Sequence, residues 1–141
     1  METKKKTVIK VETIIQAPVE KVWKFWTTPG HIMNWNTASE DWYTPYAEND
    51  LRPGGKFLSR MEARDGSAGF DFFGVYNDVK TCKLITSTLG DGRDIKVTFS
   101  GSGDETTLTE TFEAENTNPV DMQRNGWQAI LDNFKKYVES S

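Results

Sequence analysis

The sequence predicts an α+β fold in which one long C-terminal helix lies against a curved antiparallel sheet. Three observations lead to this prediction. Apolar residues recur every three or four positions between 120 and 139, which is typical of an amphipathic helix. Residues 56–113 consist of alternating segments joined by glycine-rich turns. A short aromatic segment follows Ala17-Pro18 near the N-terminus. Strands joined by short turns pair antiparallel, so the helices are expected on one face of the sheet.

The N-terminal quarter predicts one strand and two short helices. Residues 7–16 alternate well enough for a strand, which Ala17-Pro18 ends. Pro18 suits the first position of a helix that continues to Trp26, because proline lacks only an N–H that would be unpaired there. Residues 31–35 form a second helical turn after Thr28-Pro29-Gly30. Residues 36–55 show no clear period and receive no assignment.

The remaining elements follow in order. The strands are expected at 56–63, 68–79, 82–89, 95–100 and 106–113. Gly74 in the middle of its strand predicts a bulge or a close approach by another element. Asn118 is expected to cap the last helix, with Pro119 as its first residue and its end near Glu139.

Length and composition limit the classes of function. The 141 residues predict a single domain over 1–141, and a net charge of −4 argues against nucleic acid or an anionic membrane as partner. The one histidine, His31, and the one cysteine, Cys82, favour neither a metal site nor a disulfide, and no cofactor motif is present. We expect His31 to stack on Trp35 and Cys82 to be a small buried residue. The absence of a signal-peptide pattern and of a long apolar run predicts a cytoplasmic protein.

A hollow between the helix and the sheet is the first place to look for function. The chain has five Trp, four Tyr and eight Phe, enough to line such a hollow or to fill it completely. The candidate wall residues are Trp26, Trp35, Trp42, Tyr43, Phe57, Met61, Phe70, Phe72, Tyr76 and Trp127.

Glu110 is the most informative polar candidate. It shares a strand face with Leu108 and Phe112, so a regular strand would point its carboxyl inward. An inward carboxyl in an apolar hollow would have a raised pKa and could anchor a ligand or act as a general base. The alternatives are a bulge, the opposite face, or an ion pair with Arg52 or Arg60.

Several short motifs, taken in order, carry a family resemblance. They are Ala17-Pro18 with Val22-Trp23, Thr28-Pro29 with Trp35, the segment 50–57 (DLRPGGKF), Gly74-Val75-Tyr76, residues 106–109 and Gly126-Trp127. Together they resemble the START-like helix-grip superfamily. More narrowly, they resemble single-domain bacterial relatives of the C-terminal domain of the activator of Hsp90 ATPase. The resemblance implies a seven-stranded sheet wrapped around the C-terminal helix and a cavity that often takes apolar ligands. It implies no single activity.

Three functions are compatible with these features. The leading hypothesis is binding of an apolar or aromatic small molecule between helix and sheet, oriented by Tyr43, Tyr76 and Glu110. The alternative is a co-chaperone-like or stress-related interaction module that uses the segment 42–46. A cyclase- or hydrolase-type enzyme with Glu110 as base ranks last, because the sequence has no convincing acid–base pair and so no assigned catalytic residue.

Overall fold

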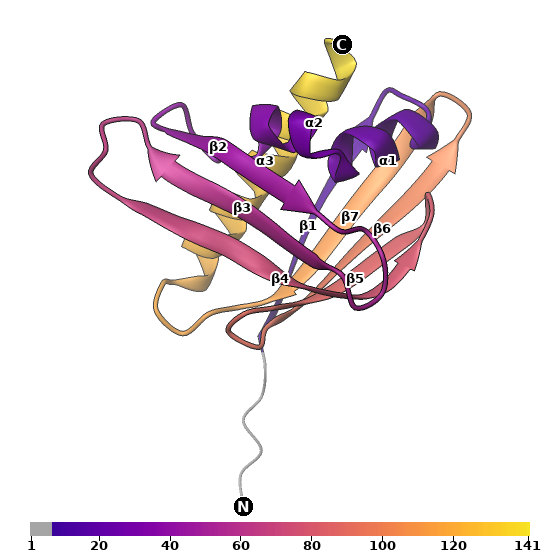
Figure 1. Cartoon of the computed structure of the whole chain (residues 1–141). Coiled ribbons are helices and arrows are strands. Elements are labelled where there is room, and N and C mark those ends of the chain that lie inside the picture. The colour runs from indigo at the N-terminus through magenta and orange to yellow at the C-terminus, as the bar shows by residue number, and fades with distance from the viewer. Residues whose placement is uncertain (1–6) are drawn as a thin grey trace, which may run out of the picture.

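The computed structural model describes residues 7–141 and confirms the α+β class (Figure 1). Within this range, seven antiparallel strands form one sheet in the order β1-β7-β6-β5-β4-β3-β2. The elements are β1 (Val8–Ile15), α1 (Val19–Thr27), α2 (Pro29–Trp35), β2 (Trp42–Asn49), β3 (Lys56–Ala63), β4 (Gly69–Lys80), β5 (Leu84–Leu89), β6 (Asp94–Ser102), β7 (Glu105–Glu113) and α3 (Val120–Glu139). No helix among these residues is both long and apolar enough to cross a bilayer.

The sheet curls around α3, which is fastened to the edge strand β1 (Figure 1). The Gln128 side chain donates to the Glu12 carbonyl at 3.1 Å and accepts from the Glu12 N–H at 3.4 Å. At the last residue of the helix, Glu139 accepts a bond from the Gln16 N–H at 2.8 Å. These bonds use backbone groups of an edge strand that would otherwise stay unpaired, so they hold α3 over the concave face.

Aromatic side chains close the end of the hollow that lies beside α1 and α2. Phe134 of α3 is fully buried, and its ring meets the rings of Trp26 and Trp35 edge-on at 5.0 and 4.8 Å. The two indoles stack on each other at 4.7 Å, and Trp35 Nε1 donates to the Phe25 carbonyl at 2.9 Å. Edge-to-face and offset arrangements of this kind are favourable for aromatic rings, so this end forms a fixed wall.

Both predicted helix starts are wrong by one residue. Pro18 and Pro119 are the N-caps of α1 and α3, with ψ angles of 150° and 145°, so neither is yet helical. Their carbonyls accept the first helical bonds, from Val22 and Gln123 respectively. Asn118 does not cap α3; its carbonyl instead accepts a bond from the Gln123 side chain at 2.8 Å.

The unassigned segment contains β2, the edge strand at the far side of the sheet from β1. Its pairing with β3 shifts register between Tyr43 and Tyr46, and Pro45 lies at that shift. Proline cannot donate a ladder bond and is tolerated at sheet edges and bulges. The bulge interrupts the alternation of side chains, which explains why the sequence shows no clear strand period here.

Cys82 and His31 differ from their predicted surroundings. Cys82 is half-buried in the turn between β4 and β5, where its φ of 62° is left-handed, so the strand begins only at Leu84. His31 does not stack on Trp35. Its ring stacks on Phe25 at 4.0 Å, and its Nδ1 shares a 2.7 Å hydrogen bond with the Tyr137 hydroxyl.

Gly74 has the close approach that the sequence predicts. A Cβ at this position would lie 2.5 Å from the Thr88 carbonyl oxygen and 2.8 Å from the Phe57 ring. Both separations are too short for a side chain. The glycine therefore lets the Phe57 ring approach β4 closely on the concave side of the sheet.

Candidate functional site

A cavity of about 630 Å³ lies between α3 and the concave face of the sheet. Its walls come from α1, α2, the strands β2 to β7 and the N-terminal half of α3. This volume is within the range of small-molecule sites, and the lining is mainly aromatic and aliphatic. The aromatic residues of the chain therefore enclose a space rather than filling it.

Nine of the ten residues predicted for a ligand site lie along this cavity. They are Trp26, Trp35, Phe57, Met61, Phe70, Phe72, Tyr76, Glu110 and Trp127. Strand alternation explains the grouping, because every second residue of β3 and β4 points to the concave face. Trp42, which the sequence also suggested as a wall residue, lines the cavity as well.

Tyr43 is the exception, and its predicted place in the wall is wrong. It pairs with Glu62 across β2 and β3, next to Trp42, and so points to the opposite face of the sheet. Its hydroxyl donates to Glu62 at 3.3 Å, and the Arg64 guanidinium lies 5.1 Å from its ring centroid. These contacts hold Tyr43 on the convex face, away from the cavity.

One wall is built by a chain of aromatic contacts between β7, α3 and β4. Trp127 stacks on Phe112 at 3.8 Å with an interplanar angle of 13°. Phe72 also contacts Trp127, with the two rings edge-on and their centroids 6.0 Å apart. Phe57 continues the wall, 6.0 Å from Phe72 and 5.0 Å from Tyr76. A ligand in the cavity would therefore meet ring faces from both the helix and the sheet.

Glu110 lies on an apolar part of the sheet and its carboxyl faces the cavity. Its cross-strand neighbours are Val11 and Val97, and the inward residues on either side of it in β7 are Leu108 and Phe112. All four are buried, and Glu110 itself is only 7% exposed. Burial raises the pKa of its carboxyl to about 8, because the charged form loses its hydration.

The carboxyl of Glu110 makes no hydrogen bond or ion pair with any residue from 7 to 141. The two arginines that were considered from the sequence as ion-pair partners of Glu110 pair with other carboxylates. Arg52 bonds Asp50 at 2.9 Å, and Arg60 bonds Glu62 at 3.0 Å. Among the described residues no fully enclosed side-chain nitrogen or oxygen lacks a partner, so the carboxyl oxygens of Glu110 are accessible from the cavity rather than sealed in the core. The position therefore marks Glu110 as the strongest candidate for contact with a ligand.

Some of the other polar groups of the cavity form hydrogen bonds within the protein, and others do not. The Tyr76 hydroxyl donates to Asn49 Oδ1, and burial raises the pKa of Tyr76. Ser59 and Ser87 are buried in the lining, and within the described part of the chain neither hydroxyl has a hydrogen-bond partner. Neither serine is among the wall residues predicted from the sequence. Alternation with Ile85 and Leu89 was the available signal for Ser87.

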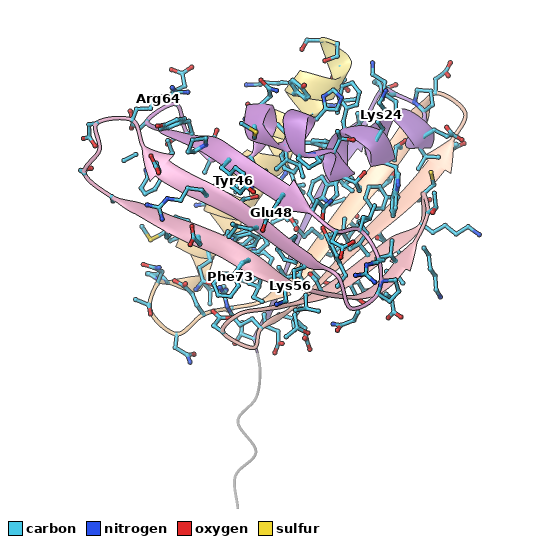
Figure 2. The ribbon with its side chains drawn as sticks, in the orientation of Figure 1. Lys24, Tyr46, Glu48, Lys56, Arg64 and Phe73 are labelled. Carbon is cyan, nitrogen blue, oxygen red and sulfur yellow. The ribbon has the colours of Figure 1, made fainter. Side chains whose placement is uncertain are left out.

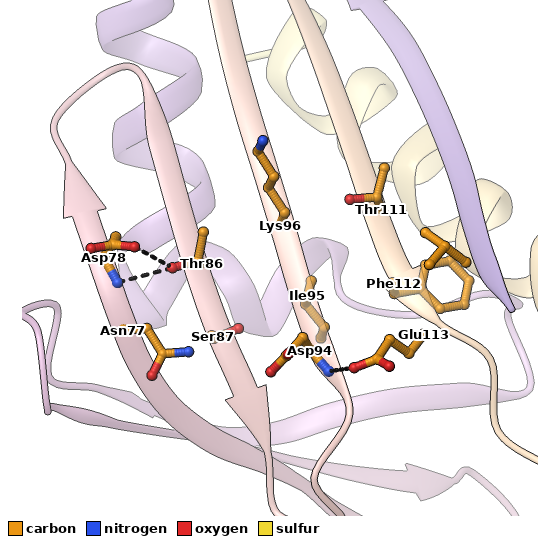
Figure 3. A pocket seen from close by; sticks show the side chains of 11 residues that line it. Asn77, Asp78, Thr86, Ser87, Asp94, Ile95, Lys96, Thr111, Phe112 and Glu113 are labelled. Carbon is orange, nitrogen blue, oxygen red and sulfur yellow. Dashed lines mark hydrogen bonds between the residues drawn. The ribbon is translucent and has the colours of Figure 1, made fainter. Parts of the chain in front are cut away.

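A second hollow, of about 490 Å³, is lined by residues of β1 and of the strands β4 to β7 (Figure 3). Its polar groups mostly bond one another. The Asp78 N–H donates to Thr86 Oγ1 at 3.0 Å, and the Asp94 N–H donates to Glu113 Oε1 at 2.7 Å. Because these groups are satisfied within the sheet, the inner cavity is the better candidate for a binding site.

Comparison with known proteins agrees with this geometry. Residues 16–139 match the family described as activator of Hsp90 ATPase homolog 1-like protein. The chain belongs to this family. Its curled sheet around a C-terminal helix is the helix-grip fold that the sequence motifs predicted. No protein with a curated description matches the chain.

Solved structures of bacterial proteins show how widely this architecture is shared. The AHSA1-like protein from Aeromonas hydrophila is 42% identical, with a TM-score of 0.89 over 95% of this chain and 93% of that one. A protein from Cytophaga hutchinsonii is 52% identical, with a TM-score of 0.82 over 94% of this chain and 92% of the other. A protein from Chromobacterium violaceum shares the fold alone, at 20% identity and a TM-score of 0.85 over 94% and 98% of the two chains.

Proposed function

We propose that this protein binds an apolar or aromatic small molecule in the cavity between α3 and the sheet. The observation that carries the proposal is a space of about 630 Å³, walled by aromatic rings and containing one unpartnered carboxyl. Burial of apolar ligand surface is favourable by about 25 cal/mol per Å² before the costs of association. The ring faces of Trp127 and Phe72 supply that surface, and Glu110 and Ser87 orient the ligand by hydrogen bonds.

Filling the cavity from α3 tests this proposal. Gly126 lines the cavity, and a Cβ added there would meet no atom within 4 Å. Leucine at this position therefore extends into the empty space, and it also favours the helix over glycine. We expect Gly126→Leu to weaken binding of the neutral apolar dye Nile red by about tenfold or more, which corresponds to at least about 1.4 kcal/mol. Dye fluorescence in a protein titration measures the affinity.

The neighbouring residue provides the matched control. Asn125 is exposed on the same helix, so Asn125→Leu adds the same side chain outside the cavity. We expect this variant to bind Nile red as the unchanged protein does. If the unchanged protein and folded Gly126→Leu bind Nile red with equal affinity, the dye does not occupy the cavity and the proposal fails.

A co-chaperone-like interaction module is the second candidate, and the convex face of the sheet favours it. Tyr46 and Phe73 lie on this face near Glu48 and Lys56 (Figure 2), and they are 48% and 52% exposed. Exposed aromatic residues on a sheet surface are typical of protein contacts. This candidate predicts stimulation of Hsp90 ATPase activity that Phe73→Ser abolishes. An unchanged ATPase rate at saturating protein would exclude it.

A further inference from the structure

We infer that the occupant of the cavity is an organic cation, an amine on an apolar ring body, whose ammonium group pairs with the carboxylate of Glu110. This inference rests on the proposed function and specifies the ligand class for the same site. It follows from three features of the lining: the unpartnered carboxyl, the ring faces around it and the balance of charge.

The carboxyl is the first feature. Val11, Val97, Leu108 and Phe112 surround Glu110 on the sheet, and none of them can donate a hydrogen bond from its side chain. An ionised carboxylate there needs a partner that enters with the ligand, because the described residues supply none. An ammonium group donates hydrogen bonds and carries the opposite charge, so it satisfies both requirements of the site.

The aromatic walls are the second feature. Trp127 and Phe72 line the cavity and contact each other, and Phe112, the next inward residue along β7 from Glu110, supports Trp127 from behind. The faces of aromatic rings carry negative electrostatic potential and attract organic cations. The same walls are favourable for the ring body of the ligand, so one surface recognises both parts of an aromatic amine.

The balance of charge is the third feature. Besides Glu110, the charged residues along the cavity are Glu48, Glu115 and Arg93. The Arg93 guanidinium is already held by Asp91 at 2.8 Å and by the Glu113 carbonyl at 3.3 Å. A ligand carboxylate would thus meet three carboxyl groups of the lining and a single cation, Arg93, that already pairs with Asp91. The lining disfavours fatty acids and other anions.

Binding by this route releases a proton. The raised pKa of Glu110 leaves its carboxyl largely protonated at neutral pH, whereas an alkylamine is already an ammonium ion in water. When the ammonium enters, the carboxyl proton passes to solvent and the ion pair forms. Calorimetry in buffers of different ionisation enthalpy measures this release, which we expect to approach about one proton per ligand.

Three probes of the same ring body test the inference. They are naphthylmethylamine, the neutral naphthylmethanol and the anionic naphthoate. We expect the amine to bind about tenfold or more tightly than the alcohol, and naphthoate to bind most weakly. Glu110→Gln is expected to remove the preference for the amine while it keeps binding of the alcohol. Glu105→Gln, an exposed position on the same strand, is the matched control and should keep the preference.

The outcomes separate this inference from the function on which it rests. If the alcohol binds the unchanged protein as tightly as the amine, or naphthoate binds best, the inferred ligand class is wrong and the binding function stands. If none of the three probes binds, both are wrong. A folded Glu110→Gln protein that retains the full amine preference would also overturn the role given to Glu110. The comparison of probes in the unchanged protein does not depend on that variant.

Discussion

Replacing Glu110 with glutamine is expected to flatten the dependence of stability on pH between about pH 5 and pH 8. Glutamine resembles the protonated carboxyl in shape, and it does not titrate. Burial raises the pKa of Glu110 from an ordinary value of 4.5 to about 8 in the folded protein. The folded chain therefore retains a proton that the unfolded chain has released across this interval.

The sign of the effect follows from that difference in bound protons. The stabilising contribution of Glu110 is fully present below the pKa that this group has in the unfolded chain. As pH rises toward the pKa of Glu110 in the folded protein, this contribution is lost and the free energy of unfolding falls. The slope is at most about 1.4 kcal/mol per pH unit for a single group. Urea denaturation at several pH values gives the free energy of unfolding, and the difference between the unchanged protein and Glu110→Gln isolates this group from the other carboxyls.

Glu105→Gln again serves as the control, since Glu105 is exposed at the start of the same strand. We expect this variant to keep the slope of the unchanged protein. Parallel curves for the unchanged protein and Glu110→Gln would contradict the burial of an unpartnered carboxyl at this position.

Removing the Phe134 ring is expected to cause the largest loss of stability from a single aromatic substitution. The Phe134 side chain is completely buried, and its ring packs against the rings of Trp26 and Trp35. Phe134→Ala leaves a void that stacked indoles cannot easily fill. Substitutions of this kind typically cost about 3–5 kcal/mol. Equilibrium denaturation measures the loss.

Phe73→Ala is the matched comparison, because Phe73 is 52% exposed on the convex face (Figure 2). We expect it to cost less than about 1.5 kcal/mol, since much of the ring already contacts water. Similar losses for the two alanine variants would show that Phe134 is not the fixed wall described above.

The sequence predicts the elements that have an uninterrupted period. The spacing of Trp127, Leu131, Phe134 and Val138 identifies α3, and turns that contain glycine separate β3 from β4, β5 from β6 and β6 from β7. The alternation of Leu108, Glu110 and Phe112 indicates correctly that the carboxyl points inward. These predictions succeed because local periodicity and tertiary packing require the same faces.

The remaining features depend on contacts that local patterns do not encode. The bulge at Pro45 moves Tyr43 to the convex face, where Glu62 and Arg64 hold it. His31 is placed by Phe25 and Tyr137, and Tyr137 is more than a hundred positions away in sequence. Whether the aromatic residues fill the hollow or enclose it depends on how α3 lies across the sheet, which composition alone does not determine.

Chemical-shift mapping tests the central claim most directly, namely that the inner cavity is the ligand site. Naphthylmethanol is added to protein labelled with nitrogen-15, and the backbone and indole N–H signals are followed. The account predicts the largest changes at Trp127, Gly126 and Ser59, and at the indole N–H of Trp26. Changes confined to Asn77, Thr86 and Lys96 of the second hollow, or no saturable change at all, would contradict it.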